Sequence, residues 1–150
     1  MRRRQRVPRQ WLVVTSDGAE LTRAMRGLER GSGLLLLAPL GRRKMTWLRQ
    51  RARQNGLTVV MEQRGKGARV HDIRELRAAL LRRTPLILLS PIYPTRTHPE
   101  WQPIARMRAA ALTRLGGRRL VALGGMNSRR FARVKDLGFQ AWAGISAFRT

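Results

Sequence analysis

The chain has 150 residues, of which 43% are hydrophobic, so it can form one folded domain with a sizeable core and is not disordered in composition. It has no cysteine, which excludes disulfides and thiolate metal sites, and its longest apolar run is far below the roughly 18 residues of a membrane span. A formal net charge of +24 favours an anionic partner. This charge is the only feature that supports nucleic-acid binding. The support is weakened because the arginines are spread along the whole chain and are not collected in one stripe.

The first half of the chain alternates between predicted strands and helices. Residues 1–9 are a basic lead whose apolar continuation is too short for a signal peptide, so we expect a cytoplasmic protein. Residues 63–72, which are glycine-rich and basic, interrupt the alternation and predict a loop. The apolar patterns predict strands at 11–17, 33–40 and 57–62 and helices at 18–31 and 44–56.

The second half continues the same alternation. The patterns predict helices at 73–84, 104–117 and 128–138 and strands at 86–90, 120–126 and 139–148. Ser128 is the expected N-cap of the last of these helices. Six strand and helix alternations predict a single domain over residues 1–150 with a parallel α/β fold and right-handed crossovers.

A rigid, donor-rich loop follows the predicted strand at 86–90. Pro91 and Pro94 restrict its backbone, while Thr95, Arg96 and Thr97 supply hydroxyl and guanidinium donors. Such a loop after a buried strand can hold a phosphate, and the alternative is a proline-rich surface turn.

Several motifs occur in order in the second half of the chain. They are VHDIRELRAAL (70–80), LLSPIYPTRTHP (88–99), LVALGGM (120–126) and AWAGISAF (141–148). In this order and spacing they resemble the thiamine phosphate synthase and thiazole tautomerase (TenI-like) superfamily. The resemblance implies a TIM-barrel-derived parallel (β/α) fold. The barrel would be incomplete, with about six or seven strands, one βα unit missing after 57–62, and no last helix.

The resemblance also implies a site for the phosphate of a thiazole substrate, formed by the loops after the last three strands. Active sites of such barrels lie at the carboxyl ends of the strands, and glycines allow backbone N–H groups to approach an anion. The alternatives are a tight strand-to-helix turn for the two glycines and a packing role for the serine. The implied phosphate-binding residues are Thr95, Arg96, Thr97, Gly124, Gly125, Ile145 and Ser146.

The synthase of this family is a transferase of thiamine biosynthesis, which joins a pyrimidine pyrophosphate to the thiazole phosphate with Mg²⁺. Here the third strand ends in Glu62 where the family has a metal-binding Asp, so Glu62 is the candidate metal ligand and its alternative is a solvated residue. The pyrophosphate-binding segment after the second strand is not matched, because Arg42 and Lys44 have the wrong spacing. Arg69 and His98 stand where the family has a serine and a lysine.

The tautomerase branch of the superfamily is matched no better. Pro91 holds the position of its proton-transfer histidine, and His98 is the nearest histidine in that loop and the candidate general base. We interpret His71 as a residue at a helix start with a local hydrogen bond.

Three functions remain open from the sequence. The first is an active thiamine phosphate synthase with Mg²⁺, and the second is a degenerate relative that binds a phosphorylated small molecule without catalysis. The third is a basic nucleic-acid-binding protein. Because a missing βα unit exposes strand edges, residues 63–69 must seal the gap, a second subunit must cover it, or the fold loses stability, and we expect a homodimer.

Overall fold

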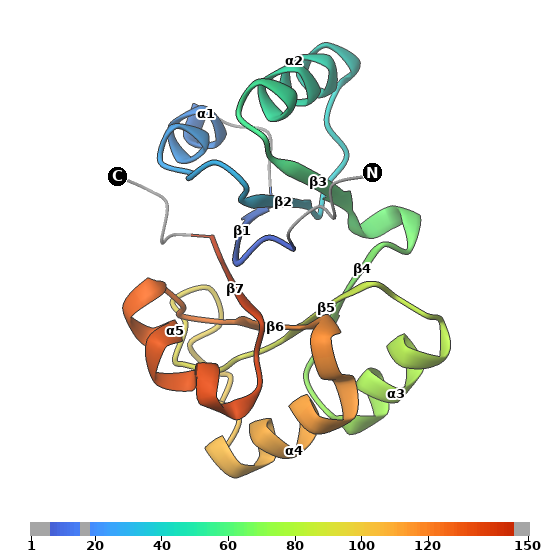
Figure 1. Cartoon of the computed structure of the whole chain (residues 1–150), viewed down its shortest axis with the longest axis vertical. Coiled ribbons are helices and arrows are strands. Elements are labelled where there is room, and N and C mark those ends of the chain that lie inside the picture. Colours follow the sequence, from blue (N-terminus) through green and yellow to red (C-terminus); the bar gives the residue numbers. More distant parts are fainter. Residues whose placement is uncertain (1–6, 16–18, 146–150) are drawn as a thin grey trace, which may run out of the picture.

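The structure is a computed structural model that describes residues 7–15 and 19–145. Seven parallel strands form one sheet in the order β3-β2-β1-β7-β6-β5-β4, and this sheet curves into a nearly closed barrel (Figure 1). The incomplete α/β barrel is therefore confirmed. The strands are β1 (Gln10–Val14), β2 (Gly33–Leu36), β3 (Thr58–Met61), β4 (Gly67–Val70), β5 (Leu86–Leu89), β6 (Leu120–Leu123) and β7 (Ala141–Gly144).

Helices on the outside connect successive strands, with one exception. Only a short 3-10 helix, η1 (Glu62–Arg64), joins β3 to β4, and this is the place of the expected missing βα unit. The predicted absence of a last helix concerns residues beyond 145, outside the described part of the chain. The α-helices are α1 (Ala19–Arg26), α2 (Arg42–Gln54), α3 (Ile73–Leu81), α4 (Arg106–Gly116) and α5 (Ser128–Val134), and two more 3-10 turns are η2 (Gly117–Arg119) and η3 (Lys135–Leu137).

Both faces of the sheet are buried, which explains why the strands are continuous apolar runs in the sequence. Along β1, Leu12 and Val14 pack with the helices on the outer face, whereas Trp11 and Val13 pack inside the barrel. This alternation follows from the two-residue period of a strand. Among the described residues, none of the helices has the length and apolar character to cross a membrane.

The predicted loop at 63–72 is wrong in part, because it contains β4. This strand pairs with β5 from Gly67 opposite Leu86 to Val70 opposite Leu89. Gly67 is buried in the barrel, where a Cβ would lie 2.9 Å from Cδ1 of Leu35. Because this strand begins with small residues, it has neither the apolar pattern nor the high strand propensity by which the sequence predicts the other strands.

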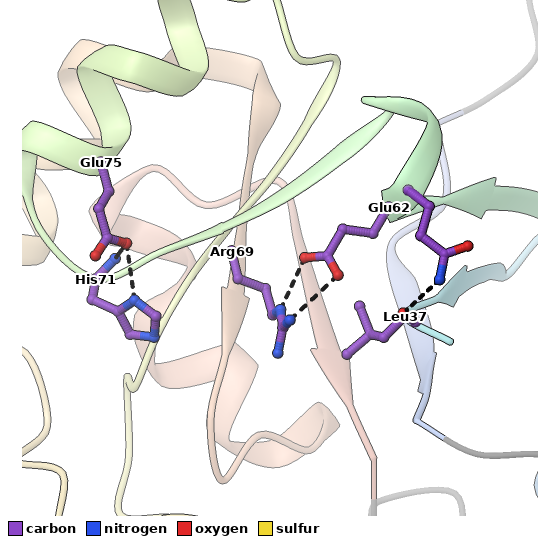
Figure 2. A network of polar contacts seen from close by, with 6 residues as sticks. Leu37, Glu62, Arg69, His71 and Glu75 are labelled. Atoms are coloured by element: carbon purple, nitrogen blue, oxygen red, sulfur yellow. Dashed lines mark hydrogen bonds and ion pairs between the residues drawn. The ribbon is translucent and has the colours of Figure 1, made fainter. Parts of the chain in front are cut away.

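The two edge strands β3 and β4 are linked across the seam by side chains of residues 62–69. The carboxylate of Glu62 accepts from Nε of Arg69 at 2.9 Å and from Nη2 at 3.3 Å (Figure 2). Nε2 of Gln63 donates to the carbonyl oxygen of Leu37 at 3.3 Å. The contact of Glu62 with Arg69 is one of the ways of sealing the seam that the sequence leaves open, whereas the contact of Gln63 holds η1 to the end of β2. The homodimer stays a prediction.

Helix α5 is capped one residue earlier than expected. It begins at Ser128, so the N-cap is Asn127, whose Oδ1 accepts from the backbone N–H of Arg130 at 2.8 Å. The prediction of Ser128 as N-cap is wrong, because Ser and Asn are both favoured caps and sequence alone does not distinguish two adjacent ones.

We expect Asn127→Ala to lower the free energy of unfolding by about 1 kcal/mol, the usual cost of losing a capping side chain. Ser128→Ala is the matched control, since Ser128 is the first residue inside the helix and makes no capping bond. Urea denaturation of both variants measures the difference. A larger loss for Ser128→Ala than for Asn127→Ala would contradict this placement of the cap.

Candidate functional site

A cavity of about 1100 Å³ opens at the carboxyl ends of the strands. Residues that end or follow all seven strands line it, as expected where parallel barrel strands end together. They include Thr15 after β1, Leu37 after β2, Glu62 after β3, His71 after β4, residues 94–98 after β5, residues 124–127 after β6 and Ile145 after β7.

The donor-rich loop after β5 is part of this cavity. Thr95, Arg96 and Thr97 all line it, and the backbone N–H of Thr97 donates to Oγ1 of Thr95 at 3.3 Å. The loop is anchored to the turn after β6, because Ile92 donates to the carbonyl of Leu123 at 2.9 Å and Tyr93 donates to that of Gly124 at 3.1 Å. The loop and the turn after β6 therefore line one cavity. The binding of a phosphate by the loop's donors stays a prediction, and a surface turn stays its alternative.

Gly124 and Gly125 line the cavity with backbone angles that favour glycine, at φ +101° and +58°. A Cβ at Gly124 would lie 2.8 Å from Cα of Pro91, and one at Gly125 would lie 2.4 Å from the carbonyl oxygen of Pro94. The close packing of the two loops therefore explains by itself why both positions are glycine. A role of their backbone in anion binding is an additional expectation.

Arg130 is a cavity residue that sequence reasoning missed. Its Nη1 donates to the carbonyl oxygen of Gly125 at 2.6 Å, and its guanidinium lies 4.8 Å from the ring centroid of Tyr93. Arg130 thereby joins α5 to both loops. The sequence alone does not distinguish Arg130 as a cavity residue, because it is one of five arginines between positions 118 and 133.

Glu62 lines the cavity, but its environment does not fit a Mg²⁺ site. Both of its carboxylate oxygens face the guanidinium of Arg69, at 2.9 Å and 3.3 Å. Within residues 7–15 and 19–145, the structure has no group of three or more side chains that could hold a metal ion. A Mg²⁺ ion takes carboxylate and other oxygen ligands, whereas here the neighbour of the carboxylate is itself a cation.

Both histidines contact Trp101, which also lines the cavity. The ring of His98 stacks on Trp101 with centroids 3.8 Å apart, and His71 meets the same indole edge to face at 5.0 Å. Nδ1 of His98 lies 3.3 Å from Oε1 of Glu100. A backbone hydrogen bond, with a smaller contribution from His98, lowers the pKa of the Glu100 carboxyl. The role of His98 as a general base stays a prediction.

His71 agrees with its interpretation as a residue at a helix start. Its backbone N–H donates to Oε2 of Glu75 at 3.0 Å, and its Nδ1 lies 3.0 Å from the same oxygen (Figure 2). Of the remaining expected site residues, Ile145 lines the cavity and Ser146 lies outside the described residues. Arg42 and Lys44 are at the start of α2 and do not line the cavity.

Similar proteins are found by sequence and by structure. Residues 52–148 match a family model described as thiamine monophosphate synthase. The thiamine phosphate pyrophosphorylase from Pyrococcus furiosus has a TM-score of 0.73 at 16% identity, over 95% of this chain and 88% of that one. The thiamine phosphate pyrophosphorylase from Bacteroides thetaiotaomicron has a TM-score of 0.59 at 14% identity, over 93% and 83% of the two chains. A search of the curated proteins gives no match. At these identities the structural likeness shows the fold alone.

Proposed function

This chain belongs to the thiamine monophosphate synthase family, and on that premise we propose that its cavity binds a phosphorylated small molecule of the thiazole phosphate type. The phosphate lies between the loop after β5 and the turn after β6. Its ligands there are Thr95, Arg96, Thr97 and the backbone of Gly124 and Gly125, with Ile145 on the side of β7. Ser146, the other expected ligand, lies outside the described residues.

The charge of the cavity carries this proposal. Arg69, Arg96 and Arg130 line it, whereas Glu62 is the single carboxylate among its described lining residues. A concave surface with an excess of one charge concentrates ions of the opposite sign, and guanidinium groups suit phosphate oxygens in particular. The cavity therefore favours an anion, in addition to the attraction expected from the net charge of +24 of the whole chain.

We propose that binding occurs without condensation of the two substrates. The groups that the family implies for pyrophosphate and Mg²⁺ are not matched here: Arg42 and Lys44 are not at the cavity, and Glu62 is paired with Arg69. An active transferase remains the alternative that family membership supports, and it requires other residues to serve in these roles.

A nucleic-acid-binding function would show a steep, linear loss of affinity with the logarithm of salt concentration, whereas a site for one phosphate would not.

We expect Thr97→Val to weaken binding of thiazole phosphate by about 1 kcal/mol, on the scale of one hydrogen bond. Arg96→Gln should cost more, about 1.5–3 kcal/mol, because it removes a charged donor. Arg129→Gln is the matched control, since Arg129 is exposed on α5 and does not line the cavity. Calorimetric titration measures all three. Equal effects of Arg96→Gln and Arg129→Gln would mean that overall charge, and not the loop, attracts the ligand.

A further inference from the structure

Exposed apolar side chains are concentrated on two helices of the barrel. Among the residues that the structure describes, six large apolar side chains are exposed, and four of them belong to α3 and α4. These four are Ile73, Leu81, Met107 and Leu115. Leu81 and Met107 are 84% and 85% exposed, so they project from the helices into solvent. Single exposed apolar residues are ordinary on a protein surface, whereas a group of them indicates a contact surface.

The four side chains lie on the outer side of two adjacent helices. On α4, Met107, Ala111 and Leu115 are exposed and follow each other at intervals of four residues, which places them on one face of the helix. Helix α3 packs beside α4 on the outside of the barrel (Figure 1). Both helices run from the carboxyl end of one parallel strand to the amino end of the next, so Leu81 and Leu115, in their last turns, lie at the same end of the barrel. We refer to Ile73, Leu81, Met107, Ala111 and Leu115 as the apolar face of α3 and α4.

The charges around this face are almost all positive. Glu75 is the single carboxylate of the two helices, and it lies against Nδ1 of His71. The exposed arginines of the two helices are Arg74, Arg77, Arg106, Arg108 and Arg114. The face therefore complements a surface that is both apolar and anionic.

Two other occupants fit this face less well than a lipid bilayer does. A second copy of the chain would bring the same arginines and a net charge of +24 into the contact, and like charges at an interface oppose association. A helix of a partner protein lays its apolar residues into a hydrophobic groove, whereas Leu81 and Met107 project into solvent. A bilayer accepts projecting apolar side chains below its headgroups, and its anionic lipids attract arginine.

We propose that the apolar face of α3 and α4 binds the surface of an anionic lipid bilayer. The axis of α4 lies parallel to the bilayer plane, because its exposed apolar residues extend from its first turn to its last. Leu81, Met107 and Leu115 enter the boundary between headgroups and acyl chains, and the arginines of both helices contact lipid phosphates. None of these residues lines the cavity, which opens at the end of the barrel and stays accessible to its ligand. The contact with lipid is therefore independent of ligand binding in the cavity.

The test is sedimentation of the protein with vesicles at about 0.15 M salt, where attraction between exposed charges is screened beyond roughly 8 Å. One set of vesicles is phosphatidylcholine alone, and the other contains equal parts of phosphatidylcholine and phosphatidylserine. We expect binding to the mixed vesicles and at least about tenfold weaker binding to phosphatidylcholine alone. Leu81→Gln/Met107→Gln keeps the charge of the chain and should weaken binding to the mixed vesicles at least about tenfold, because two apolar side chains no longer enter the bilayer. Both substituted side chains are exposed, so this variant keeps its fold, which urea denaturation checks.

Two controls separate the apolar face from the charge of the whole chain. Val7→Gln replaces an exposed apolar residue outside α3 and α4, and it should leave the affinity for the mixed vesicles within about twofold. Arg108→Gln should weaken binding about fivefold, because an arginine contributes only near the bilayer surface. Arg129→Gln, at an exposed position of α5, should change it by less than about twofold for the same reason.

Each contrary result would overturn the lipid contact. Native affinity of Leu81→Gln/Met107→Gln for the mixed vesicles, or equal losses in Arg108→Gln and Arg129→Gln, would show that overall charge attracts lipid and that this face does not. Failure of the unmodified protein to bind either kind of vesicle would exclude the contact outright. Sedimentation equilibrium without vesicles tests the second copy: a dimer that dissociates in the double variant would make the face a contact between two chains.

Discussion

Gly125→Val is expected to abolish phosphate binding and to lower the free energy of unfolding by about 3 kcal/mol. Gly125 has a φ of +58°, which a β-branched residue adopts only with strain of about 1–3 kcal/mol. Its Cβ would also lie 2.4 Å from the carbonyl oxygen of Pro94, and overpacking of this kind costs about 1–3 kcal/mol. The variant must therefore separate the turn after β6 from the loop after β5, and the proposed site lies between these two segments.

Two measurements on this variant are needed, urea denaturation for stability and calorimetry with thiazole phosphate for binding. Gly41→Val is the matched control, because Gly41 has a φ of −59° and open space where its Cβ would be. We expect that control to keep its affinity and to lose less than about 1 kcal/mol, the scale of a changed helix cap. Native affinity in Gly125→Val would exclude the site between the two loops.

Gly33→Val is expected to lower the free energy of unfolding by about 3 kcal/mol, at the upper end of the usual cost of overpacking. Gly33 of β2 is opposite Trp11 of β1 in the register of the sheet. A Cβ at Gly33 would lie 2.1 Å from Cε3 of the indole ring, which is buried inside the barrel. The valine side chain and the indole cannot both occupy this space.

The double variant Gly33→Val/Trp11→Leu tests this explanation. Trp11→Leu alone is destabilising, because it leaves a cavity inside the barrel. Since the smaller leucine makes room for the valine, the loss in the double variant should be smaller than the sum of the two single losses by at least about 1 kcal/mol. Strictly additive losses in urea denaturation would show that Trp11 is not the group with which the valine collides.

The architecture could be predicted because its signals are local. Both faces of the sheet are buried, so most strands are short apolar runs, and the helices between them have apolar residues at helical spacing. The segments that carry the resemblance follow strands whose carboxyl ends meet, and their placement around one cavity follows from the barrel. Two local predictions were wrong. The strand β4 was missed because it is short and begins with Gly67 and Ala68. The N-cap of α5 was placed at the wrong residue because Asn127 and Ser128 are adjacent candidates for one cap.

The candidate site was predicted only in part, because several of its residues depend on contacts between distant segments. The expected loop and glycine residues do line one cavity. Arg130 is not distinguished by its neighbours in sequence, and its place follows from contacts with Gly125 and Tyr93. The pairing of Glu62 with Arg69 depends on η1 bringing the ends of β3 and β4 together. A strand-end glutamate in the sequence is compatible with a metal ligand, a solvated residue or an ion pair.

The most direct test of the account is calorimetric titration of the protein with thiazole phosphate, with and without Mg²⁺. The pyrimidine pyrophosphate is then added, and released pyrophosphate is assayed. The account predicts binding of thiazole phosphate with the same affinity in both conditions and no release of pyrophosphate. Absence of binding, or release of pyrophosphate that depends on both substrates, would contradict it.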